Sequence, residues 1–260
     1  MDYTTDHFGF SLGQAVLYAS VTGGPQLRFL NPVELFFFEH TNEPKDAVLN
    51  LLLDTQVWYQ TNDLALYAEG VLDDVDFDPE DPLNPQNPVR APARYAVAMG
   101  LRLLGLNDRV ELALDYERVS AFAYRTIGAA TDRYTFLDRG LGPNFVDYDR
   151  VSVRSDIFTP LAGLRLTPAL SVQRQGEGDL REPIPAAFRG EPTFFLGIKE
   201  TTYRLGLQGR YQPNRHYWVA WDIGANFVTN ALHVPGADRT EFTGVIRAGI
   251  SLDLPLRRSD

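Results

Sequence analysis

The sequence predicts an all-β protein, more specifically a transmembrane antiparallel up-and-down β-barrel of the bacterial outer-membrane type. Three observations lead to this prediction. Segments of about ten residues alternate between apolar and polar side chains, which is the period of a strand with two unlike faces. The connections between these segments alternate between short and long. No uninterrupted apolar run approaches the roughly 20 residues that a membrane helix needs.

Five predicted strands lie in the first half of the chain, at residues 8–20, 47–60, 64–74, 93–104 and 108–124. In the fourth of them Tyr95, Val97 and Met99 share one face. Arg94 and Arg102 share the opposite face. The fifth alternates in the same way through RVELALDYE, so one face of each strand is apolar and the other is charged.

Five more predicted strands lie at residues 148–158, 162–174, 194–211, 216–228 and 240–254. In the third of these, Tyr203 and Leu205 alternate with Arg204 and Gly206. Pro168 lies inside the segment 162–174, where it removes a hydrogen bond from the ladder, so we expect a bulge or bend there. The chain therefore predicts about ten strands in a single domain, residues 1–260.

The lengths of the connections predict which strand ends lie together on the same rim of the barrel. Short connections rich in turn-forming residues fall at 61–63, 105–108, 159–160 and 212–215, and long ones at 21–46, 75–92, 125–146, 175–193 and 229–239. Short turns on one rim and long loops on the other are typical of outer-membrane barrels. The segment LRFLNPVELFFFEH lacks alternation, so we expect 21–46 to form either a plug in the lumen or a long loop.

Strand length and aromatic placement favour a lipid-facing apolar surface over the alternative of a soluble barrel or sandwich. Soluble strands usually have five or six residues, whereas tilted membrane strands need about 9–11. Tyr203 and Tyr211 lie eight residues apart on one apolar face, a separation of roughly 20 Å of membrane height. The sequence predicts further outward aromatics at Tyr116, Phe122, Tyr124, Tyr217 and Trp221.

The polar face is then expected to line a lumen. Its predicted charges include Arg94, Arg102, Arg154, Arg165, Arg204, Arg210, Glu111, Asp115 and Asp222. Mixed signs favour ion pairs that hold the wall together. The alternative is a transverse field that orients solutes in a water-filled passage.

Composition excludes several classes of function. A net charge of -10 argues against nucleic-acid binding, because phosphate contacts need a surplus of lysine and arginine. The chain has no cysteine, which excludes disulfides, thiolate metal sites and cysteine nucleophiles. The first ten residues form no signal peptide, so we expect that a signal was removed or that the chain is a section of a longer protein.

The loop 125–146 and the residues just after it mix flat aromatic rings with guanidinium and amide groups, which suits sugar rings and hydroxyls. The candidate glycan-binding residues are Tyr134, Phe136, Arg139, Asn144, Phe145 and Tyr148. The acidic stretch DDVDFDPEDP lacks the glycine and spacing of a defined calcium loop, so no metal ligand is predicted. The four histidines form no catalytic motif, and neither a catalytic residue nor a cofactor is predicted.

Several phrases resemble the capsule-assembly (Wzi-type) family of outer-membrane proteins. They are LGQAVLYASVTGGPQLRFLNPVELFFFEH, ALYAEGVLDDVDFD, DYERVSAFAYR and RGLGPNFVDYDRVSV, and together they cover most of residues 12–155. The resemblance implies a non-enzymatic protein of the bacterial outer membrane that contacts lipid and lipopolysaccharide and binds or organises surface polysaccharide through its loops. Because members of that family are larger, it also implies that this chain corresponds to a C-terminal section of such a barrel.

Two other functions stay open at this point. A porin or substrate-selective channel for small polar solutes would use the charged lumen. A rim-located hydrolase would use His233 with Asp238, or the pair Asp73 and Asp74, in place of a recognisable motif. The oligomeric state is not predicted.

Overall fold

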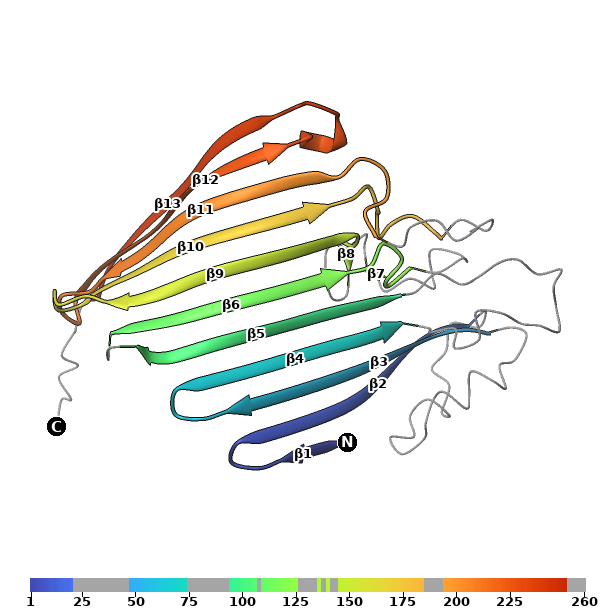
Figure 1. Cartoon of the computed structure of the whole chain (residues 1–260), viewed down its shortest axis with the longest axis horizontal. Coiled ribbons are helices and arrows are strands. Elements are labelled where there is room, and N and C mark those ends of the chain that lie inside the picture. Colours follow the sequence, from blue (N-terminus) through green and yellow to red (C-terminus); the bar gives the residue numbers. More distant parts are fainter. Residues whose placement is uncertain are drawn as a thin grey trace, which may run out of the picture.

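The computed structural model describes residues 1–20, 47–73, 94–106, 109–125, 135–136, 139–140, 145–184 and 194–251. One antiparallel sheet of 11 strands dominates it, with the strands side by side in chain order (Figure 1). The strands are β1 (Asp2–Thr4), β2 (Phe8–Ser20), β3 (Ala47–Gln60), β4 (Leu64–Asp73), β5 (Tyr95–Leu106), β6 (Val110–Val119), β9 (Tyr148–Phe158), β10 (Leu164–Gln175), β11 (Glu200–Tyr211), β12 (Tyr217–Thr229) and β13 (Arg239–Ile250). A separate two-stranded pair joins β7 (Thr135–Phe136) to β8 (Arg139–Gly140).

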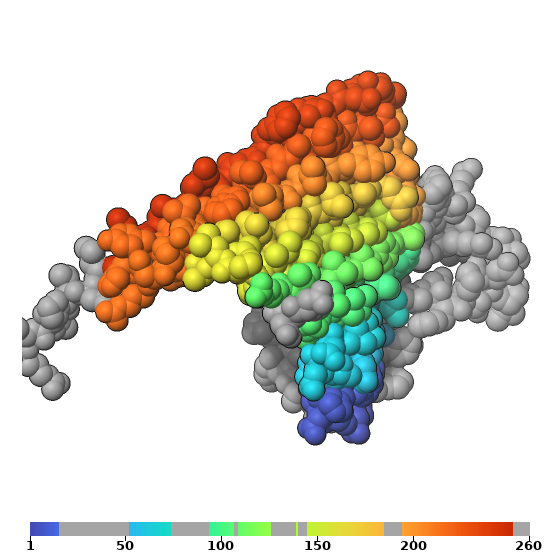
Figure 2. All heavy atoms as spheres, turned by 60° about the vertical axis from the view of Figure 1, so that its left-hand side comes forward, coloured from blue at the N-terminus to red at the C-terminus, as the bar shows by residue number. Residues whose placement is uncertain are grey.

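The up-and-down order is confirmed, and each of the ten predicted strands is present, with the short β1 added at the N-terminal edge. Closure into a barrel is not observed. β1 and β13 form the two edges of the sheet, and no ladder joins them in the described part of the chain. Figure 2 shows these edges, blue and red, at opposite ends of the sheet. The observed fold is therefore an open up-and-down sheet.

The two ends of the sheet differ as predicted. Short connections join neighbouring strands at one end, for example at 61–63 and 212–216, whereas connections such as 120–147 and 176–199 join them at the other (Figure 1). Turn chemistry explains the short ones. The Asn214 side-chain oxygen accepts hydrogen bonds from the backbone N–H groups of His216, at 2.9 Å, and Tyr217, at 3.1 Å.

Pro168 causes no bulge, so that part of the prediction is wrong. Its pairing with β11 runs without a register shift from Leu164 to Gln175. Toward β9 the ladder is interrupted only at Thr167 and Pro168 and resumes in the same register at Ala169. The proline therefore removes one bond on one side of the strand, which a sheet tolerates when its other side stays paired.

The register separates an apolar face from a polar face. Residues directly opposed on neighbouring strands share a face, and one such row runs from Tyr116 through Val151, Val172 and Tyr203 to Phe227. Many large apolar side chains of this face are solvent-exposed, including Leu170, Leu205, Tyr217, Phe242 and Ile246. Within the described residues, no helix is long and apolar enough to cross a membrane.

Charged side chains occur on the apolar face in only one row of the described strands, near the long-loop end. The row places Arg118 opposite Asp149, and Asp149 opposite Arg174. Arg174 donates two hydrogen bonds to Asp149, and the Arg118 guanidinium lies 3.5 Å from the centre of the Phe194 ring. The apolar surface therefore ends at this row, near the long-loop end of the sheet.

Two strand boundaries differ from the prediction by five residues or more. β6 ends at Val119, before Phe122 and Tyr124. Phe122 is only 1% exposed and Tyr124 has a left-handed φ of 62°, so neither is an outward aromatic of a strand. β11 begins at Glu200, six residues later than predicted. The segment 21–46, predicted as a plug or long loop, lies outside the described residues.

Candidate functional site

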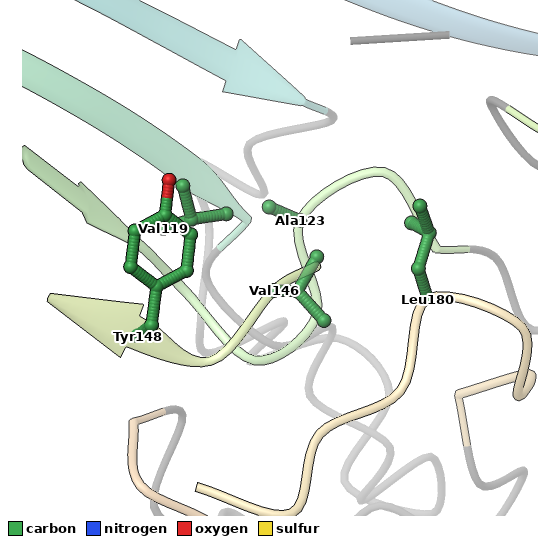
Figure 3. Close-up of a cluster of buried hydrophobic side chains, with 5 residues drawn as sticks. All are labelled: Val119, Ala123, Val146, Tyr148 and Leu180. Carbon is green, nitrogen blue, oxygen red and sulfur yellow. The ribbon is translucent and has the colours of Figure 1, made fainter. Parts of the chain in front are cut away.

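The long-loop end of the sheet carries the most deeply buried part of the molecule. Segments 120–125, 145–149, 176–184 and 194–198 pack together there, and we call them the rim core. Its buried apolar side chains are Val119, Ala121, Phe122, Ala123, Val146, Tyr148, Leu180 and Ile184. Figure 3 shows Val119 and Tyr148 on neighbouring strands, with the other residues of their cluster on loop segments. Because Val119 and Tyr148 belong to the polar face, the loops fold onto that face at its rim.

Asp147 joins three loop segments through its carboxylate. Its Oδ1 accepts the backbone N–H of Phe195 at 2.5 Å, and its Oδ2 accepts those of Leu196 at 2.8 Å and Gly178 at 3.1 Å. Burial raises the pKa of Asp147, while these N–H donors and the charge of Arg125 act in the opposite direction. The carboxylate therefore holds segments 176–178 and 194–196 against the start of β9.

Glycine is required where the loop passes Asp147. A Cβ on Gly176 would lie 2.1 Å from the Asp147 Oδ2, and one on Gly178 would lie 2.6 Å from the Asp147 Cβ. No side chain fits at such distances without moving the chain. The two glycines bring the backbone close enough for the hydrogen bonds of Asp147 to form.

Arg125 joins the turn 120–125 to the end of segment 176–184. The guanidinium donates to the carbonyl oxygens of Ala121 at 2.9 Å, Glu182 at 2.8 Å and Pro183 at 2.9 Å. Arg125 is 3% exposed. A planar guanidinium with its donors in a fixed fork is suited to binding three carbonyls at once.

The turn is held to the sheet by Asp73 and Arg94. The backbone N–H of Tyr124 donates to the Asp73 Oδ2 at 2.5 Å, and Arg94 donates to the carbonyl oxygen of Arg125 at 3.0 Å. Burial, followed by the charge of Asp73, raises the pKa of Tyr124 to about 12. Arg94 is 6% exposed, so the prediction that it is a lumen charge is corrected: it is a structural residue of the rim.

An open hollow of about 450 Å³ lies against the rim core. Its lining includes Phe145, Gln175, Glu177, Asp179, Arg181 and His233. Phe145 is 44% exposed and offers a ring edge or face to solvent. Carboxylate, amide, guanidinium and imidazole groups surround that ring, which is a donor and acceptor set suited to the hydroxyls of a sugar.

The charged groups of this hollow are fixed by local contacts. Arg181 donates to both carboxylate oxygens of Asp179, at 3.0 Å and 2.6 Å, and these bonds hold the pKa of Asp179 below its usual range. Glu177 accepts the backbone N–H of Ile198 at 3.0 Å. His233 donates from Nδ1 to the carbonyl oxygen of Ile198 at 2.7 Å, which fixes the tautomer of the ring.

The predicted glycan-binding residues do not lie together in one site of the described structure. Phe145 lines the rim hollow, and Arg139 is exposed on β8. Tyr148 is 7% exposed and packs in the rim core, so its ring is not open to a sugar and that prediction is corrected. Tyr134, Asn144 and the side chain of Phe136 lie outside the described residues.

Sequence reasoning missed most of the residues that line the hollow. Gln175 is the last residue of β10 and Gly176 to Arg181 follow it directly, whereas His233 belongs to the short 3₁₀ turn η3 (Ala231–His233) between β12 and β13. The run QGEGDLR, which mixes glycine with charged and amide residues directly after a strand, is the signal that indicates such a loop.

The predicted lumen charges lie together on the polar face, mostly in cross-strand pairs. Arg102 contacts Asp115 at 2.8 Å, and Arg204 contacts Asp222 at 3.2 Å. Arg165 contacts Asp156 at 3.1 Å. The remaining predicted members of this face are Arg154 and Glu111 on the middle strands and Arg210 on β11. Most of these charged residues therefore form ion pairs between strands of the sheet.

The residues considered for hydrolysis are not arranged as a catalytic site. Asp73 is fully buried under Tyr124, and Asp74 lies outside the described residues. Asp238 accepts the backbone N–H of Asn230 at 3.4 Å, while His233 bonds to Ile198. In the described part of the chain, no group of three His, Cys, Asp or Glu residues could hold a metal ion.

Neither a family model nor a curated protein sequence matches this chain.

Proposed function

We propose that this chain forms the wall of a bacterial outer-membrane β-barrel and, without catalysing a reaction, binds or organises surface polysaccharide, such as capsule, at its long-loop rim. The observation that carries the proposal is the rim hollow. It combines an exposed aromatic ring, Phe145, with fixed polar groups on a buried loop scaffold. A scaffold of this kind lowers the conformational cost of binding an extended, flexible ligand.

The membrane location is supported by the two faces of the sheet. A continuous apolar face in which Leu205 is 55% exposed and Ile246 is 75% exposed would be costly in water. The opposite face carries the ion pairs that suit an aqueous lumen. In lipid the free edges at β1 and β13 must be paired, either with each other or with further strands, because lipid offers no hydrogen-bond partners.

Polysaccharide is the ligand class that suits the hollow. Its dimensions allow one or two sugar rings, and Phe145 can stack against the apolar face of a ring while Gln175 and Glu177 bond hydroxyls. The capsule-assembly resemblance in the sequence points to the same ligand class. A bound sugar would also contact the Arg181 and Asp179 pair, which presents one charge of each sign.

The proposal is tested by binding of the detergent-folded chain to an array of neutral and acidic bacterial polysaccharides. Phe145→Ala should weaken binding roughly tenfold, the loss of one stacking contact of about 1.4 kcal/mol. Tyr3→Ala is the matched control, because Tyr3 is also an exposed aromatic but lies on the edge strand β1, away from the hollow. Wild-type chain that retains no glycan, or equal losses in the two variants, would refute a glycan site in this hollow.

A channel for small polar solutes is the second candidate, favoured by the Arg and acid pairs on the polar face. Planar-bilayer conductance separates the two functions. Steady ion conductance without glycan binding would favour the channel.

A further inference from the structure

A second hollow lies on the polar face, far from the rim core. It has a volume of about 420 Å³ and is formed by β10 to β13 near their short-turn ends. Its lining includes three arginines, Arg165, Arg210 and Arg247, and a single carboxylate, Asp222. The surplus of positive charge contrasts with the net charge of -10 of the whole chain.

The register brings the three arginines into one row across the sheet. Arg165 lies directly opposite Arg210, and Arg210 lies opposite Ala220 on the next strand. Ala220 lies opposite Arg247 on β13. Directly opposed side chains have Cβ atoms about 4.5–5.5 Å apart, at which like charges repel. The small Ala220 side chain leaves the space between Arg210 and Arg247 open.

The nearby carboxylates that the structure describes neutralise this row only in part. Asp156 binds Arg165 and Thr167, at 3.1 Å and 2.5 Å. Asp222 binds Arg204, which comes from a different row, and Gln208. Of the two acids, only Asp156 therefore contacts a member of the arginine row.

Among the residues that the structure describes, two of the three guanidinium groups have no anionic partner. Arg210 donates to the neutral side-chain oxygen of Gln212 at 2.9 Å, and its guanidinium lies 5.5 Å from the centre of the Trp218 ring. Arg247 is exposed and forms no ion pair or hydrogen bond with its side chain in the parts of the sheet that the structure describes. Arg165 is thus paired with Asp156, whereas no acid of the described residues neutralises Arg210 or Arg247.

We infer that Arg210 and Arg247, with Arg165, form a binding site for an oxyanion, namely the carboxylate or phosphate group of a small anionic solute. A guanidinium fork matches both groups with two parallel hydrogen bonds. An oxyanion in the hollow would neutralise the repulsion between the directly opposed Arg165 and Arg210. The inference goes beyond the proposed glycan site, because it uses a different hollow on different strands.

The test measures binding of inorganic phosphate, glucuronate and glucose to the detergent-folded full chain by calorimetry, in about 0.15 M salt. Binding of phosphate, glucuronate or both, with none of glucose, is the expected result, and the two anions separate the phosphate source from the carboxylate source. The same anions should raise the midpoint of thermal unfolding. A wild-type chain that binds neither anion would overturn the inference.

Three variants localise the binding. Arg210→Gln and Arg247→Gln should each weaken anion binding at least tenfold. Arg154→Gln is the matched control, because Arg154 is an exposed arginine of the same face that lies opposite Ala113 and Ala169, outside the hollow. Equal weakening by Arg154→Gln would show a general charge effect and overturn the site. Far-ultraviolet circular dichroism confirms that each variant is folded, and loss of glycan binding by Phe145→Ala leaves this outcome unaffected.

Discussion

Replacement of Arg125 by lysine tests whether the rim core depends on one guanidinium. Lysine keeps the positive charge on a flexible side chain only about one atom shorter, so the main loss is the fork of donors. Arg125 donates to three carbonyl oxygens, on Ala121, Glu182 and Pro183, at 2.8–2.9 Å. A single ammonium group cannot reach three carbonyls in this arrangement, and we expect it to keep one of them.

The expected cost follows from the two hydrogen bonds that are lost. A hydrogen bond to a charged group contributes about 1.5–3 kcal/mol, and the two losses are not fully additive because they share one donor group. We therefore expect segment 176–184 to lose about 3 kcal/mol of local stability. At 1.4 kcal/mol for each factor of ten, this is a rise of roughly 10²-fold in the local opening equilibrium.

Hydrogen exchange of the folded chain, read by mass spectrometry, measures this opening directly. Amides of 176–184 should exchange roughly 10²-fold faster in Arg125→Lys, whereas those in the middle of β10 should not change. The matched control is Arg181→Lys, because the Arg181 side chain is 66% exposed and its pair with Asp179 should contribute under about 1 kcal/mol. Wild-type exchange rates in Arg125→Lys, or equal effects of the two variants, would refute the role of Arg125.

Two further predictions concern the rim and the apolar face. The difference in phenolate absorbance between the wild-type chain and Tyr124→Phe should titrate with a pKa of about 12. The stability that neutral Tyr124 contributes is therefore full below pH ~10 and is lost as the pH rises through about 12. A titration midpoint near 10 would mean that the ring is solvated. Leu205→Arg, in the middle of the apolar face, should lower the free energy of unfolding in lipid vesicles by about 2–4 kcal/mol. Ser152→Arg, beside Asp115 on the polar face, should lower it by under about 1 kcal/mol. Similar small losses for both variants would argue against lipid contact.

The strands could be predicted from sequence because their two faces meet unlike surroundings. Tyr203 and Leu205 alternate with Arg204 and Gly206 in the sequence, and the register places these pairs on opposite faces of β11. The order of the strands followed from the lengths of their connections. Closure could not be predicted, since alternation is the same in an open sheet and in a barrel.

The end of β6 shows where pattern reasoning stops. Phe122 and Tyr124 continue the alternation of the strand, so a sequence pattern extends it to residue 124. The chain turns at Ser120 because of contacts that are remote in sequence, including the bond from Tyr124 to Asp73, 51 residues away, and those from Arg125 to Glu182 and Pro183. Arg118 on the otherwise apolar face is the one local sign that the strand is ending.

The same reason explains why Phe145 was the one residue of this hollow predicted to bind a glycan. Its neighbours Gln175, Glu177 and Arg181 come from a different loop, which Asp147 and Arg125 bring alongside it. Those two anchors are buried charged residues in loops, a combination that composition does not reveal. A buried loop charge with several backbone partners is the feature that a sequence cannot show and a structure can.

The charged row on the apolar face indicates where the rim hollow would lie relative to the proposed membrane. Arg118, Asp149 and Arg174 lie on the side that would face lipid, and Arg174 is paired while Arg118 stacks on Phe194 of the rim core. Charges are tolerated at the membrane interface and are costly within the hydrocarbon, so in the proposed membrane orientation the row would mark the limit of the lipid-facing band. The hollow begins at Phe145 and Gln175, beyond that row along β9 and at its level on β10. In the proposed orientation it therefore opens outside the hydrocarbon, at the height where a surface polysaccharide would meet the protein.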